Sequence, residues 1–202
     1  MKYKLFLTFF ILAIALISQT LSHTTVTGGG GSGALTLISK QVIAVPTNTI
    51  TFSSIPGTYT NLTIYISARC DDTSNVDDVY MQFNGDTGNN YSRTYYGAND
   101  TGAFQGNGIS QATIPIMDIP CANASAGAAG AGTINIPNYA GIFWKNYLSQ
   151  IGFLNAIGSQ TSANIGALWA NTGAITQIVI GNTTTPAANF IVGSTFTLYG
   201  MQ

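Results

Sequence analysis

The segment that most constrains the fold is residues 79–97, VYMQFNGDTGNNYSRTYYG. Val79, Met81 and Phe83 fall on one side of a period-2 pattern, which is typical of a half-buried β-strand. The Asn-Gly pair at 84–85 follows at once, and both residue types tolerate a positive φ, so the pair turns the chain sharply. The sequence therefore predicts two strands joined by a short loop, with further sheet built around this hairpin.

The composition extends this expectation to the whole chain. Charged residues make up 6% of the sequence, and glutamate, which helix surfaces normally use, does not occur. Short apolar segments separated by Gly, Asn and Pro instead predict an all-β fold, a two-sheet antiparallel sandwich. The expected strands are 34–45, 49–52, 62–69, 79–83, 91–96, 109–117, 133–137, 142–154, 165–170, 175–181 and 190–199.

Several of these segments resemble a known family in the same order along the chain. FSSIPGTYTNLTIYISAR, FNGDTGNNY, INIPNYAG, LWANTGAITQIVI and NFIVGSTFTLYGM are similar to a jelly-roll domain common among structural proteins of tailed bacteriophages. The resemblance covers about Gly33 to Gln202. It implies a jelly-roll sandwich of about eight to ten strands and a role in a virion or phage tail.

Residues 1–22 have the form of a targeting segment. Lys2 and Lys4 precede a 13-residue apolar stretch, Leu5–Ile17, and a short polar tail follows it. We expect a signal peptide, because a membrane span usually needs about 20 apolar residues. An uncleaved membrane anchor and a buried hydrophobic arm remain the alternatives. The mature protein is then expected outside the cell or on a virion surface.

Residues 23–33 combine a β-prone pentapeptide with a glycine-rich tether. A disordered leader is the ordinary interpretation. The alternative is that the pentapeptide adds as a strand to the sheet edge of a neighbouring subunit. The residues concerned are His23, Thr24, Thr25, Val26 and Thr27. Residues 34–202 form the expected folded domain.

Four aspartates within eight residues, at 71–78, form the main concentration of charge. Carboxylate oxygens at this density suit calcium, although the spacing does not fit an EF-hand loop. A solvated loop is the alternative, and no other cofactor is expected. The candidate calcium ligands are Asp71, Asp72, Asp77 and Asp78.

Aromatic side chains near Asn, Asp and Thr suit the binding of neutral glycans. The candidates are Tyr91, Tyr95, Tyr96 and Trp144. Packing in the core and contact between subunits are the alternative roles, because several of these residues alternate within strands.

Cys70 and Cys121 are the two cysteines of the chain. Export would expose them to an oxidising environment, so a disulfide is one alternative and two free thiols are the other. Residues 121–132 are rich in Ala and Gly and are expected to form a mobile surface loop. Arg69 is expected to pair with Asp86 or with the aspartate-rich loop.

No catalytic combination emerges, because the single histidine, His23, precedes the tether, and the carboxyl groups fit turns and strand ends. The net charge of −1, without a basic cluster in the expected domain, argues against nucleic acid as a partner. We therefore expect a non-enzymatic structural or attachment module that associates with copies of itself and contacts cell-surface glycan. A secreted subunit that polymerises by N-terminal strand addition and a monomeric carbohydrate-binding module are the alternatives.

Overall fold

The structure is a computed structural model that describes residues 33–154, 158–183 and 188–202. The expected targeting segment and the strand-adding residues His23 to Thr27 lie outside the described residues. Within the described ranges there is no α-helix, and hence no helix with the length and hydrophobicity of a membrane span.

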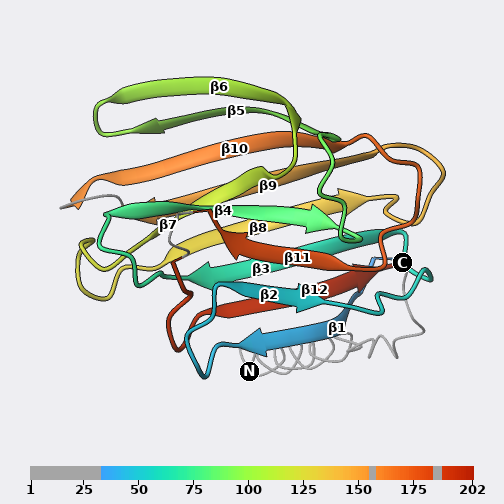
Figure 1. Ribbon diagram of the computed structural model, residues 1–202, viewed down its shortest axis with the longest axis horizontal. Helices are drawn as coiled ribbons and strands as arrows, with labels where there is room; N and C mark the ends of the chain where they lie inside the picture. Colours follow the sequence, from blue (N-terminus) through green and yellow to red (C-terminus); the bar gives the residue numbers. More distant parts are fainter. Residues whose placement is uncertain (1–32, 155–157, 184–187) are drawn as a thin grey trace, which may run out of the picture. The chain divides into compact units, whose positions relative to one another are not determined.

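Twelve β-strands make up the described part of the chain (Figure 1). They are β1 (Leu35–Val42), β2 (Thr49–Phe52), β3 (Asn61–Ala68), β4 (Val76–Phe83), β5 (Tyr91–Asn99), β6 (Gly102–Gln111), β7 (Ile114–Pro120), β8 (Gly130–Pro137), β9 (Lys145–Leu154), β10 (Gln160–Trp169), β11 (Ile178–Asn182) and β12 (Thr195–Met201).

These strands form two antiparallel sheets that pack as a sandwich, which confirms the predicted fold class. The larger sheet has eight strands in the order β1-β12-β3-β8-β9-β10-β5-β6, and the smaller has four in the order β2-β11-β4-β7. Figure 1 shows β5 and β6 extending past the smaller sheet on one side. The described residues form more strands than the eight to ten that the resemblance implies, and one more than the eleven expected from the sequence pattern.

The predicted hairpin is present, with the Asn-Gly turn where the sequence placed it. Asn84 and Gly85 both have positive φ, 53° and 68°, and join β4 to β5. Asn84 also accepts hydrogen bonds from the backbone N–H groups of Thr176 (2.9 Å) and Gln177 (3.0 Å). The turn is therefore fixed to the segment that leads into β11.

The additional strand is β6, most of which lies between the strands expected at 91–96 and 109–117. Glycines of both strands have a packing role in the β5–β6 pair. A Cβ atom at Gly97 would collide with the Phe104 ring, and one at Gly106 would collide with Tyr95. Each glycine therefore makes room for an aromatic ring from the neighbouring strand.

The core between the sheets is apolar and aromatic at its centre. The Phe83 ring lies 5.5 Å from Tyr147 and 5.3 Å from Trp169, and Tyr91 stacks on Trp169 at 6.4 Å. All four side chains are almost completely buried. Alternating inward residues of β3, β4, β8 and β11, together with the buried residues of β7, supply most of the aliphatic remainder.

Residues 121–132 are held by the disulfide that the sequence offered as one alternative and by Arg69, which the sequence did not connect to them. Cys70 and Cys121 form a disulfide, with their Cα atoms 4.4 Å apart. The Arg69 guanidinium donates hydrogen bonds to the loop carbonyls of Ala122 (3.4 Å), Ala124 (3.0 Å), Ser125 (2.9 Å) and Ala128 (2.8 Å). The expectation that Arg69 pairs with an aspartate is wrong, because these carbonyls occupy its donors.

Candidate functional site

The candidate site is the outward face of seven strands of the larger sheet: β12, β3, β8, β9, β10, β5 and β6. The seven strands contain two charged residues, Arg93 and Lys145. Their register partners, Ala167 and Trp169, are buried, so both residues belong to the inward side. No outward side chain of these strands is charged, and we call this surface the neutral face.

The strand register arranges the neutral face in straight rows across the sheet. The first central row is Thr197, Tyr65, Thr133, Gln150, Asn164, Tyr96 and Gln105, and the second is Tyr199, Thr63, Asn135, Leu148, Gly166, Thr94 and Asn107. Both rows consist mainly of amides, hydroxyls and tyrosines.

Neighbouring side chains within these rows bond to one another. The Thr63 hydroxyl donates to Asn135 Oδ1 (3.0 Å), and the Gln150 amide donates to Asn164 Oδ1 (3.3 Å). The rings of Tyr65 and Tyr199 meet edge to face at 5.8 Å. These contacts order the face without using charge.

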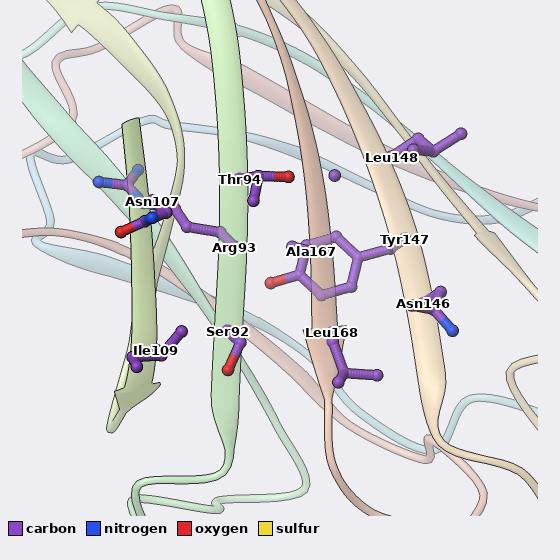
Figure 2. Close-up of a pocket in the computed structure, with 11 residues that line it drawn as sticks. Ser92, Arg93, Thr94, Asn107, Ile109, Asn146, Tyr147, Leu148, Ala167 and Leu168 are labelled. Carbon is purple, nitrogen blue, oxygen red and sulfur yellow. The ribbon is translucent and has the colours of Figure 1, made fainter. Parts of the chain in front are cut away.

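Three adjoining shallow hollows lie at the β6 end of the neutral face. Thr94 lines all three, which have volumes of about 420, 460 and 330 Å³. Figure 2 shows the first hollow, where Thr94 lies between the strand that carries Asn107 and Ile109 and the strand that carries Leu148. Gly166 has no side chain to fill the space between Thr94 and Leu148. The hollows combine amide and hydroxyl groups with exposed apolar side chains, and Arg93, an inward residue of β5, also lines the first hollow.

The four predicted glycan-binding aromatics do not form one platform. Tyr91 is completely buried in the core, where the Phe83 N–H donates to its hydroxyl (2.9 Å) and burial raises its pKa to about 12. Tyr95 lies on the inward side, with the Arg93 guanidinium 4.8 Å from its ring centre. Tyr96 alone lies on the neutral face, with 65% of its surface exposed. Strand alternation separates Tyr95 from Tyr96, so the structure does not bring the four residues together, and glycan binding stays a prediction.

Trp144 lies elsewhere, in an apolar loop between β8 and β9. Ile142, Phe143 and Trp144 are exposed by 78%, 69% and 56%. The next residue, Lys145, is buried, and its ammonium donates to the carbonyls of Gly141 (2.6 Å), Phe143 (2.6 Å) and Thr172 (3.2 Å). Burial lowers the pKa of this ammonium. Lys145 thus fixes a loop that displays three bulky apolar side chains.

A cavity of about 310 Å³ lies between the sheets beside β7. Asp78, Asp118 and Arg93 line it together with apolar and aromatic side chains. Burial, followed by a hydrogen bond with Asp78 and the charge of that residue, raises the pKa of Asp118 to about 8. Carboxyl groups that share a hydrogen bond are closer than the separations that glycoside hydrolysis uses. The two carboxyl groups therefore share a proton.

The four predicted calcium ligands do not converge. Asp71 accepts from the backbone and side chain of Asn189 (2.7 and 2.9 Å), Asp72 accepts from the Ser74 N–H (2.9 Å), and Asp78 faces Asp118. Among the described residues, no group of three or more His, Cys, Asp and Glu side chains is placed to hold a metal ion. Asp77 accepts from the Thr183 hydroxyl (3.2 Å). The four aspartates thus have separate partners, and calcium binding stays a prediction.

Two features of the structure escaped the sequence reasoning. The sequence contains one signal for the buried role of Lys145, which is that this lone lysine directly follows Ile-Phe-Trp. It contains no signal for the pairing of Asp78 with Asp118, because that pairing depends on the register of β4 against β7.

No protein-family model, no curated protein and no solved structure matches the chain. Its function is therefore inferred from its own geometry.

Proposed function

We propose that the described domain is a non-enzymatic structural or attachment module of an extracellular assembly, with a jelly-roll topology. The chain repeatedly crosses between the two sheets: β2, β4, β7 and β11 lie in the smaller sheet, and the strands before and after each of them lie in the larger. Such crossing is expected of Greek-key and jelly-roll chains. The disulfide supports an oxidising, extracellular setting.

The observation that carries the proposal is the absence of charge from the neutral face. A soluble monomer of this size normally keeps charged groups of both signs dispersed over its surface. Amide, hydroxyl and tyrosine side chains cost less to desolvate than charges, and subunit interfaces are depleted of charge at their centres. A seven-strand face of this kind therefore suits packing against another subunit.

Sedimentation of the protein at micromolar concentration tests this proposal. The double variant Thr94→Lys/Thr133→Lys places two charges on the neutral face, where both residues belong to the central rows. The matched control, Thr49→Lys/Thr51→Lys, places the same charges at exposed positions of β2 in the smaller sheet. We expect the wild type and the control to form assemblies, packed through the neutral face, that the face variant does not form. Monomers in all three proteins would refute the proposal.

The hollows beside Thr94 favour one second function, the binding of a neutral glycan by a monomer. Tyr96 and the amides of Asn107 and Asn164 supply an exposed ring and uncharged hydrogen-bonding groups within one region. This function predicts a monomeric wild type, and a neutral glycan that binds the wild type but not the variant Tyr96→Ala.

A further inference from the structure

The four edge strands of the sandwich differ in how they are protected against pairing with another chain. Open edges invite pairing with another chain, and proteins usually block them with short strands, proline, lysine or bulges. The edges here are β1 and β6 in the larger sheet and β2 and β7 in the smaller.

Three of these edges are blocked. In β1 the register shifts between Leu37 and Ser39, and Lys40 is exposed. β2 is only four residues long. β7 contains Pro115 and ends at Pro120, and its Pro115 carbonyl accepts a hydrogen bond from Arg93 (3.2 Å).

β6 has none of these protections over most of its length. It spans ten residues, contains no proline and no charged side chain, and pairs regularly with β5 from Gly102 to Gly108. An irregularity occurs only beyond Gly108, where Ser110 has a φ of 52°. Outside the β5–β6 ladder, the described residues make one hydrogen bond to the β6 backbone, from the Gln111 amide to the Ile109 carbonyl (2.8 Å).

We propose that the β6 edge pairs with the β6 edge of a second copy of this chain, in an antiparallel arrangement about a two-fold axis at Gln105. This inference rests on the proposed function and names the contact that begins the assembly. With the axis at Gln105, Gly102 lies opposite the partner's Gly108. All seven residues that pair regularly with β5 then find a partner in the second copy. The pairing also keeps outward residues opposite outward residues, because their positions differ by an even number.

The uncharged strand suits this partner for an electrostatic reason. In a two-fold pairing, each side chain meets a residue of the same strand, and a charge near the axis would meet its own copy. β6 carries no charge that could do so. The row that includes Asn164, Tyr96 and Gln105 would continue directly into the same row of the partner. Two neutral faces would then form one continuous surface.

Cysteine cross-linking of the full-length chain tests the register. Opposite residues in antiparallel strands have Cα atoms about 4.5–5.5 Å apart, within the range for a disulfide. The variant Gln105→Cys should therefore form a cross-linked dimer under mild oxidation. In the matched control Asn107→Cys, the two cysteines would be offset by four residues, about 13 Å, so cross-linking should be at least about tenfold weaker. Equal cross-linking of the two variants, or none in either, overturns the pairing.

Sedimentation of one further variant beside the face variant separates this inference from the proposed function. Ala103→Lys/Gln105→Lys charges the edge, and Thr94→Lys/Thr133→Lys charges the face further inside. Loss of the dimer in the edge variant, together with the Gln105→Cys cross-link, supports the pairing. If the face variant alone dissociates and Gln105→Cys does not cross-link, the edge pairing is wrong and the face proposal stands. A cross-linked dimer that persists in the face variant, after its larger assemblies are lost, supports the edge pairing as a contact separate from the face.

Discussion

Asp78 and Asp118 lie directly opposite each other on β4 and β7, and their carboxyl groups share a hydrogen bond. Burial raises the pKa of Asp118 to about 8, assisted by the hydrogen bond and charge of Asp78 and by the charge of Asp77, while Arg93 opposes the shift. The folded protein therefore holds a proton on Asp118 that the unfolded chain, with a pKa of about 3.9, gives up at neutral pH.

This proton makes folding stability depend on pH. Between about pH 4 and pH 8 the folded state binds more protons than the unfolded state, so the free energy of unfolding falls as the pH rises through this window. The variant Asp118→Asn keeps a side chain that can donate to Asp78 and has no proton to lose. We expect wild-type stability to fall by at least about 1 kcal/mol more than that of the variant between pH 5 and pH 8.

Urea unfolding of the two proteins at both pH values measures this difference. Asp100→Asn, at an exposed position after β5, serves as the control and should follow the wild type. Parallel pH profiles for the wild type and Asp118→Asn would show that Asp118 carries no proton in the folded protein.

Replacement of Lys145 tests how the apolar loop is held. The variant Lys145→Met keeps most of the buried volume but removes three hydrogen bonds to carbonyl groups. We expect a loss of about 1–3 kcal/mol in unfolding free energy and faster amide exchange in residues 141–144. Lys40→Met, at an exposed position of β1, is the matched control. Unchanged stability and exchange in Lys145→Met would contradict the role assigned to the ammonium.

The disulfide between Cys70 and Cys121 closes a loop with a sequence separation of 51 residues. Chain-entropy estimates give about 4 kcal/mol for a loop of this length. The double variant Cys70→Ala/Cys121→Ala should unfold at correspondingly lower urea concentration. Thiol titration of the unreduced, denatured wild type should find no reactive thiol, and two would contradict the bond.

Much of the fold could be predicted because most of its strands alternate apolar and polar residues. Leu62, Ile64 and Ile66 alternate with polar residues, and each is buried as the alternation requires. β6 escaped this rule because its inward positions include Gly106 and Gly108, and its partner strand supplies the ring that covers Gly106. Strand propensities do not show that an aromatic ring on one strand packs over a glycine on the next.

The candidate site could be predicted only in part. Low charge was visible in the composition, but its complete absence from one face depends on the register that turns Arg93 and Lys145 inward. Arg69 and Lys145 both bind backbone carbonyl groups, and such partners have no sequence signature. Tyr91 and Tyr96 looked equivalent in the sequence, although one lies in the core and the other is exposed.

The central claim is that the neutral face is covered when the protein assembles, and hydroxyl-radical labelling of tyrosines measures this directly. Tyr65 and Tyr96 lie on the neutral face with 42% and 65% exposure, whereas Tyr80 lies on the outward side of the smaller sheet. Labelling is compared between dilute protein and assembled protein at micromolar concentration. We predict that Tyr65 and Tyr96 become protected on assembly while Tyr80 does not. Equal labelling of all three tyrosines at both concentrations would contradict the account.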